Sequence, residues 1–135
     1  MADLLHKPLQ CIVVTPERAL LDAKADFVAL PMYDGELGVL PGRAALIGRL
    51  GYGELRLRDG NTTEHFFIDG GFAQVRNNVV TVLTPRAKKV SEIDARKAEE
   101  ELEAALAPTA TPEAAEVAYK AQQRARAQLR LARKE

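Results

Sequence analysis

The chain of 135 residues has room for one large domain or for a small domain with an appendage, but not for two full enzyme domains. Its 47% apolar and 28% charged residues are typical of an ordinary folded protein and argue against a disordered, disulfide-rich or membrane-spanning chain. Basic and acidic residues balance at 19 each, so the overall charge offers no attraction for nucleic acid. The single cysteine, Cys11, lies in the apolar run LQCIVV, where we expect a buried side chain in a reducing compartment.

The first part of the chain consists of short apolar runs separated by turns that contain glycine or asparagine. In the run ELRLR, Leu55 and Leu57 alternate with charged residues, the period expected of a strand with one buried face. Asn77 and Asn78 separate the last two runs and suit a tight hairpin turn, because asparagine tolerates a positive φ. We therefore predict an antiparallel β-sandwich or flattened barrel. Its expected strands cover residues 9–15, 26–32, 54–59, 64–69, 72–77 and 79–84.

The second part has the composition of helices. No glycine follows Gly71, and residues 91–135 contain thirteen alanines. We predict one helix that starts at Ser91 and ends near Ala107, and a second that starts after Thr111 and runs to about Arg133. The predicted fold class is thus α+β, with an N-terminal sandwich over residues 1–87 and a C-terminal antiparallel helical hairpin over residues 88–135.

The stripes expected to pack the two helices together are mostly alanine. One alanine methyl contributes under about 1 kcal/mol on burial, against roughly 2 kcal/mol for a leucine side chain. The first helix is mainly acidic and the second mainly basic, but exposed ion pairs add only about 0 to 1 kcal/mol each. These magnitudes predict a weakly held hairpin that can detach, although a solvated hairpin with no switching role stays open as an alternative.

No pattern in the sequence indicates catalysis or metal binding. The chain lacks a CxxC pair, HExxH, GxSxG and a phosphate-binding GxxxxGK[ST] loop, and His6 and His65 are far apart in sequence. His65 is expected to be an exposed strand residue, and GELGVLPG, which spans residues 35–42, is expected to be a structural loop. We therefore predict no catalytic residues and no metal site.

Motifs in a fixed order resemble the ε subunit of bacterial F-type ATP synthases. They are GELGVLPGRAAL at residues 35–46, Asp69 to Phe72, VVTVLT at 79–84, Ile93-Asp94 at a helix start, and AQLRLA at 127–132. The resemblance covers nearly the whole chain. It departs from the family pattern at Arg43 and Ala45, where histidine and proline are usual.

This resemblance implies a central-stalk rotor subunit that has no active site of its own and couples proton translocation to ATP synthesis. Its implied partners are the γ subunit, the c-ring and the α/β catalytic head, and it would reach the cytoplasmic face of the cell membrane only through them. The residues expected to bind γ or the c-ring are Glu36, Leu37, Gly38 and Arg43. The family's hairpin can inhibit ATP hydrolysis, and we place that role on a basic face formed by Lys120, Arg124, Arg126, Arg130 and Arg133.

Some family members also bind ATP in the hairpin, through the pattern I/L-D-x-x-R-A and arginines of the second helix. The matching residues here are Ile93, Asp94, Lys97, Ala98 and Arg124. Lysine at position 97 lacks the guanidinium fork that binds phosphate through two hydrogen bonds, and Gln128 replaces a second arginine. We therefore expect weak ATP binding at most and no other cofactor. A free-standing adaptor or weak ATP-sensing module of the same architecture stays open as the alternative function.

Overall fold

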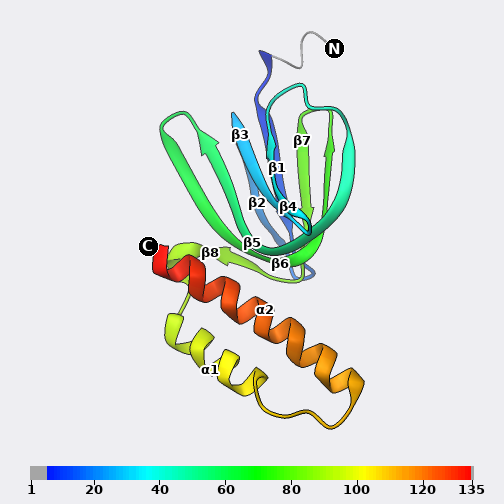
Figure 1. Cartoon of the computed structure of the whole chain (residues 1–135). Helices are drawn as coiled ribbons and strands as arrows, with labels where there is room; N and C mark the ends of the chain where they lie inside the picture. The colour runs from blue at the N-terminus through cyan, green and yellow to red at the C-terminus, as the bar shows by residue number, and fades with distance from the viewer. Residues whose placement is uncertain (1–5, 135) are drawn as a thin grey trace. The chain divides into compact units, whose positions relative to one another are not determined.

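A computed structural model describes residues 6–134 of the chain, with Lys134 described through its backbone only. The chain divides after Lys89 into two compact units. The first unit is built of strands and the second of helices (Figure 1). This arrangement confirms the α+β class and the order, sandwich then helical hairpin, predicted from the sequence.

Eight strands form the first unit. They are β1 (Leu9–Val14), β2 (Ala19–Ala25), β3 (Phe27–Met32), β4 (Gly35–Val39), β5 (Leu46–Asp59), β6 (Thr62–Arg76), β7 (Val79–Leu83) and β8 (Ala87–Lys89). The strand order is β2-β1-β7-β6-β5-β3-β4, with β8 paired to β6. All pairs are antiparallel except β1 with β7, which is parallel. The sheet is thus mainly antiparallel, as predicted, and departs from this at one pair, because the long connection between β1 and β7 lets the two strands run in the same direction.

The strands β5 and β6 are long and strongly curved, and they pair along almost their whole length (Figure 1). The sequence predicted two separate strands at 64–69 and 72–77, but β6 continues through both. Gly70 and Gly71 have φ values of 71° and 109°, a region open to glycine, and they bend the strand without ending it. Phe66 and Ile68 before the bend, and Val75 after it, all belong to one hydrophobic core.

The core of the sandwich is mostly aliphatic. It includes Cys11, whose side chain is fully buried as expected. Burial, and secondarily the nearby Asp22, raises the pKa of the Cys11 thiol to about 12. The thiol therefore stays protonated near neutral pH, and Cys11 acts as a small apolar core residue.

Three strands were not predicted from the sequence: β2, β4 and the three-residue β8. β2 has the sequence ALLDAKA and β4 the sequence GELGV, and neither is rich in β-branched or aromatic residues. Pairing with β1 and β3, respectively, holds them in the sheet. The GELG motif, expected to be a loop, is therefore part of a strand at the edge of the sheet.

The second unit contains a short 3-10 turn (Val90–Glu92), α1 (Ala95–Ala105) and α2 (Pro112–Lys134). The first helix begins later than expected, because Asp94 rather than Ser91 is its N-cap and accepts a 3.2 Å hydrogen bond from the Lys97 amide. The second N-cap is Thr111, as predicted, and its hydroxyl accepts a 3.1 Å hydrogen bond from the Ala114 amide. Pro112 occupies the first helical position.

The stripes predicted to pair the two helices are buried only in part, since Ala95 and Ala114 are exposed. Ala98 of α1 and Ala125 and Leu129 of α2 are buried, and Leu102 is half-buried. The Gln122 side chain donates a 2.9 Å hydrogen bond to the carbonyl of Ala105, the last residue of α1. Two ion pairs, Arg96 with Glu100 and Lys120 with Glu116, each lie within a single helix.

Candidate functional site: a docking surface on the sandwich

The residues expected to bind the partners lie at two places along the edge of the sheet. Glu36, Leu37 and Gly38 are on β4, whereas Arg43 follows its other end, in the connection of residues 40–45. Pro41 therefore stiffens only the region around Arg43 and not a single loop that carries both charges. The side chains of Glu36 and Arg43 are exposed, and Leu37 packs partly against the core.

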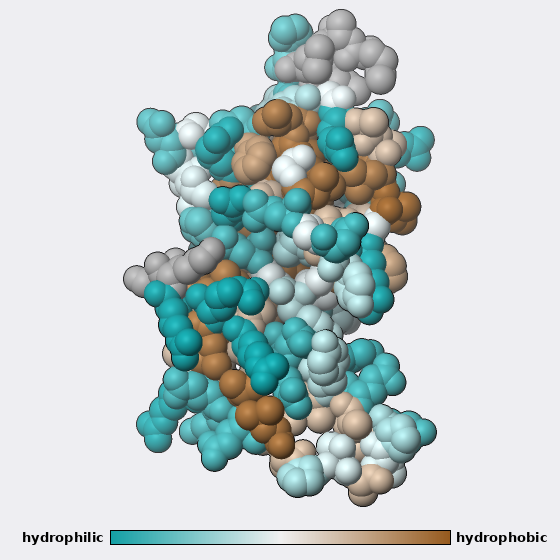
Figure 2. Space-filling model, in the orientation of Figure 1, coloured by the Kyte–Doolittle hydropathy of each residue, from teal (hydrophilic) through white to brown (hydrophobic). Residues whose placement is uncertain are grey.

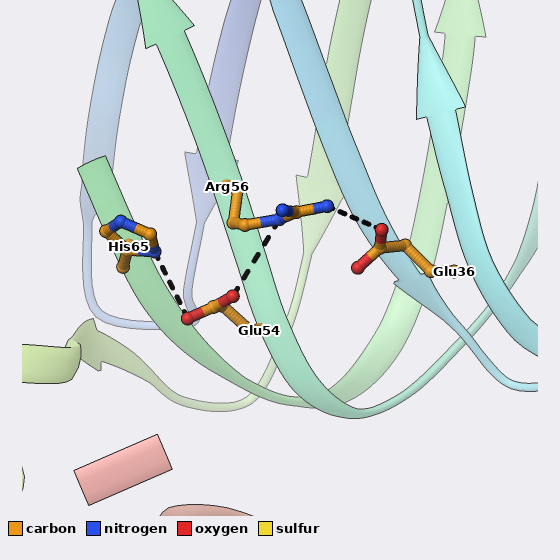
Figure 3. A network of polar contacts seen from close by, with 4 residues as sticks. All are labelled: Glu36, Glu54, Arg56 and His65. Atoms are coloured by element: carbon orange, nitrogen blue, oxygen red, sulfur yellow. Dashed lines mark hydrogen bonds and ion pairs between the residues drawn. The ribbon is translucent and has the colours of Figure 1, made fainter. Parts of the chain in front are cut away.

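Glu36 belongs to a row of polar side chains from β4, β5 and β6 that passes over β3, the strand between β4 and β5 (Figure 3). Arg56 of β5 donates a 2.5 Å hydrogen bond to the Glu36 carboxylate, and its Nε lies 3.8 Å from Glu54. On β6, His65 Nδ1 lies 3.2 Å from the other oxygen of Glu54. His65, expected to be exposed, is half-buried because of this position beside Glu54. The row holds the Glu36 carboxylate toward Arg56 and offsets its charge locally.

A second ion pair stabilises the neighbouring end of β5. Arg58 lies 2.9 Å from Asp26 and 5.1 Å from the centre of the Phe27 ring. The Gly60 amide also donates a 2.8 Å hydrogen bond to Asp26. Hydrogen bonds from Arg58 and from the Gly60 amide hold the pKa of Asp26 below its usual value of 3.8.

The structure shows an exposed apolar surface that was not predicted from the sequence. Val14, Leu83, Phe72 and Arg49 occupy paired positions on four adjacent strands, β1, β7, β6 and β5. The Arg49 guanidinium stacks 4.3 Å from the centre of the Tyr33 ring. We call these five residues the apolar band.

Large parts of the apolar band are exposed. The exposed fractions are 57% for Phe72, 53% for Leu83 and 67% for Tyr33, and the nearby Ile47 is exposed by 74%. Between β1, β6 and β7 the surface forms a shallow groove lined by Val14, Pro16, Phe72, Leu83 and Pro85. Hydrophobic residues also come to the surface of the sandwich in Figure 2. A sequence signal existed, since Leu83 and Phe72 alternate with the core residues Val82 and Ala73 and so belong to the outer face.

Exposed apolar side chains gathered on one surface often mark an interaction site. Aromatic residues and arginine are enriched in the cores of protein interfaces, and Phe72, Tyr33 and Arg49 supply both. Among the described residues there is no cluster of histidine, cysteine and acidic side chains that could hold a metal ion. The surface thus has the chemistry of protein docking.

The helical unit holds the residues expected to bind ATP. The Asp94 carboxylate caps α1, Ala98 is buried, and the Lys97 side chain is exposed. Ile93 and Arg124 are half-buried. Two of the five residues therefore have a structural role in the hairpin, as a helix cap and as a packing residue.

The basic residues of α2 do not form the single face that we expected. At about 100° per residue, Lys120 and Arg124 lie on one side of the helix, and Arg126, Arg130 and Arg133 lie on another, roughly 130° away. All are exposed except Arg124, which is half-buried. We call them the first and second basic clusters.

Comparison with known proteins decides the family. Residues 8–90 match the family model described as ATP synthase, Delta/Epsilon chain, beta-sandwich domain. The chain is 56% identical over 126 residues to the ATP synthase epsilon chain of Rhodopirellula baltica, which covers 93% of this chain and 98% of that one. The chain belongs to the ATP synthase epsilon chain family. It is thus a non-catalytic subunit of ATP synthase, as the resemblance implied.

A less similar relative is also described as an ATP synthase epsilon chain. The epsilon chain of Granulibacter bethesdensis is 40% identical over 127 residues, or 90% of this chain and 94% of that one. Two solved structures share the fold at lower identity. A chain of the Euglena gracilis mitochondrial ATP synthase, in an assembly described as OSCP/F1/c-ring, has a TM-score of 0.79 at 24% identity and covers 88% of this chain and 78% of its own. A chain of the Tetrahymena thermophila central stalk and c-ring has a TM-score of 0.73 at 16% identity, with coverages of 92% and 96%.

Proposed function

We propose that this chain is a rotor subunit of the central stalk, which docks through its sandwich on the γ subunit and the c-ring and helps to couple proton translocation to ATP synthesis. Through these partners it would lie at the cytoplasmic face of the cell membrane. The observation that carries the proposal is the apolar band beside a paired polar edge on one rigid sandwich. The solved assemblies that share the fold are described as containing a c-ring, which supports the choice of partners. Among the described residues, no helix has the length and apolar character needed to cross a bilayer.

The two parts of the surface suit different partners. The apolar band would bury Phe72 and Leu83 against γ, because burial of large apolar side chains supplies most of the affinity of stable interfaces. The polar edge, with Glu36, Leu37, Gly38 and Arg43, would meet the polar loops of the c-ring, where charged groups contribute specificity and association rate.

Substitution of each part tests this assignment. We expect Phe72→Ser combined with Leu83→Ser to weaken recovery of γ in a pull-down, and Glu36→Lys combined with Arg43→Glu to weaken recovery of the c-ring. Both variants should keep the sandwich folded, because all four side chains are exposed. As a matched control, Lys24→Glu combined with Glu64→Lys reverses two charges at other exposed positions and should leave assembly unchanged. Unchanged recovery of γ and c together with unchanged proton pumping would show that this surface does not dock, and would favour the free-standing adaptor.

We further propose that the hairpin inhibits ATP hydrolysis by the assembled complex. Alanine is frequent among the buried residues of its helices, and the second helix carries two basic clusters able to meet acidic surface of the α/β catalytic head. Val117 and Tyr119 are exposed by 69% and 59% and could add apolar contacts there. Weak internal packing and unused surface on one hairpin support an arm that exchanges between docking positions.

A further inference from the structure

The connection that carries Arg43 makes no strand pairing of its own. Residues 40–45 lie outside the strands, and most of them are exposed. Leu40 to Arg43 form a turn in which the Arg43 amide donates a 3.2 Å hydrogen bond to the Leu40 carbonyl. Pro41 and Gly42, with φ of 84° at the glycine, occupy the two central positions of a type II turn. One such turn at the surface holds an arginine only loosely unless another part of the protein fixes it.

A residue from a different hairpin supplies that support. Asn78 lies in the turn between β6 and β7, and its side chain accepts a 2.8 Å hydrogen bond from the Gly42 amide. The same side chain donates to the Lys7 carbonyl at 3.4 Å, and the Asn78 carbonyl accepts a 2.8 Å hydrogen bond from the Gln10 amide. Asn78 is only 5% exposed. It therefore joins the Arg43 turn to the start of β1.

The requirements of its own turn do not explain the side chain at position 78. Asn77 and Asn78 have φ values of 50° and 64°, as in a type I′ hairpin turn. Glycine is the favoured second residue of such a turn, so backbone conformation alone would favour glycine at position 78. What asparagine adds is the amide group, and that group bonds to the residue next to Arg43.

We propose that Asn78 is a positioning residue for docking: it holds the Leu40–Arg43 turn so that Arg43 is presented to the c-ring in one conformation. The inference rests on the proposed docking role of Arg43. The residue contributes by pre-organisation, because a turn already ordered in the free subunit loses less conformational entropy on binding.

The experiment measures the affinity of the full-length chain for a γ–c-ring assembly purified without this subunit. Asn78→Gly keeps the backbone conformation of the turn and removes the amide, and we expect about a three- to tenfold loss of affinity, in the range of one hydrogen bond. Asn77→Gly, at the neighbouring exposed position, is the matched control and should bind like the wild type. Asn78→Asp keeps an acceptor for the Gly42 amide but loses the donor to the Lys7 carbonyl, so it should restore part of the affinity that Asn78→Gly loses.

A double variant separates this inference from the proposed function. Arg43→Gln should itself weaken binding, and Asn78→Gly should add little to it if the two residues act through the same turn. No effect of Arg43→Gln would contradict the docking role of the turn. An effect of Arg43→Gln, with Asn78→Gly equal to Asn77→Gly or fully additive to Arg43→Gln, would overturn the positioning role alone. If Asn78→Gly does not fold, hydrogen exchange of the Gly42 amide in the wild type decides, and fast unprotected exchange would overturn the inference.

Discussion

Glu36 differs from a free surface carboxylate because Arg56 already binds it. A partner that approaches Glu36 meets an ion pair in which the glutamate side chain is 55% exposed and the arginine side chain 37%. Partly exposed pairs of this kind contribute about 0 to 1 kcal/mol to folding, so the pair has little weight in stability. Its consequence is geometric: the carboxylate is held in one direction at the edge of the sheet.

Asp26 gives a pH-dependent prediction at the same scale. Its pKa is lowered in the folded chain, so the stability that it contributes is present above its usual pKa of 3.8 and is lost as the pH falls through the lower folded value. We expect Asp26→Asn to lower the thermal unfolding temperature at neutral pH. The difference from the wild type should shrink toward zero at about pH 2. Thermal unfolding followed by circular dichroism at both pH values checks this, and a difference that does not depend on pH would contradict it.

Among the secondary-structure elements, the bend of β6 depends on Gly71. A Cβ atom added there would lie 2.0 Å from the Leu83 carbonyl oxygen, and the φ of 109° is itself strained for other residues. We expect Gly71→Ala to lower the free energy of unfolding by more than about 2 kcal/mol, since either the backbone or β7 must move. The matched control is Gly60→Asn, because Gly60 also has a positive φ but open space around its Cβ position. Urea unfolding of both variants measures the difference, and equal stabilities would refute the role given to the bend.

The start of α1 combines a structural role with the predicted ATP site. Asp94→Ala should destabilise the hairpin by about 1 kcal/mol through loss of the N-cap, whereas Asp94→Asn should keep the cap.

ATP binding through Lys97 stays a prediction. We expect Lys97→Arg, which restores the guanidinium of the family pattern, to strengthen ATP binding several-fold. Isothermal titration with ATP tests this, and equal affinities of the wild type and the Lys97→Arg variant would argue against a nucleotide site in the hairpin.

At the scale of the whole molecule, the prediction concerns the C-terminal hairpin as an inhibitor of ATP hydrolysis. Deletion of residues 91–135 should leave the sandwich folded, because its own core contains sixteen buried residues that all precede residue 83. ATP hydrolysis by the reconstituted complex should then rise. The two basic clusters allow a sharper test than one five-residue change. Glutamine at Arg126, Arg130 and Arg133 should reproduce the deletion if the second cluster meets the head, and glutamine at Lys120 and Arg124 if the first does.

Salt separates the possible causes of inhibition. Electrostatic inhibition should weaken in the wild type as the salt concentration rises, since exposed charges are screened within about 10 Å at 0.1 M salt. If the deletion raises hydrolysis and neither glutamine variant does, inhibition comes from steric insertion of the helices. If the deletion has no effect on hydrolysis, the hairpin is not inhibitory in this complex.

Features decided by residues close together in the sequence could be predicted, and features decided by residues far apart could not. The hairpin turn at Asn77 and Asn78 and the Thr111 cap were predictable, because a few neighbouring residues decide them. The candidate site was only partly predictable. Glu36 and Arg43 could be named from a motif, but the partners of their segments, Arg56 and Asn78, come from strands and turns twenty or more residues away.

The sequence by itself determined the composition boundary, the alternation of buried and exposed residues in most strands, and the two helices. These features depend on local propensity and on the period of the apolar pattern. Only the tertiary structure decided that β1 runs parallel to β7, that β6 bends through Gly71 instead of ending, and that Phe72, Leu83 and Tyr33 form one surface. The physical reason is that strand pairing joins residues remote in the chain, and no local pattern specifies which strands become neighbours.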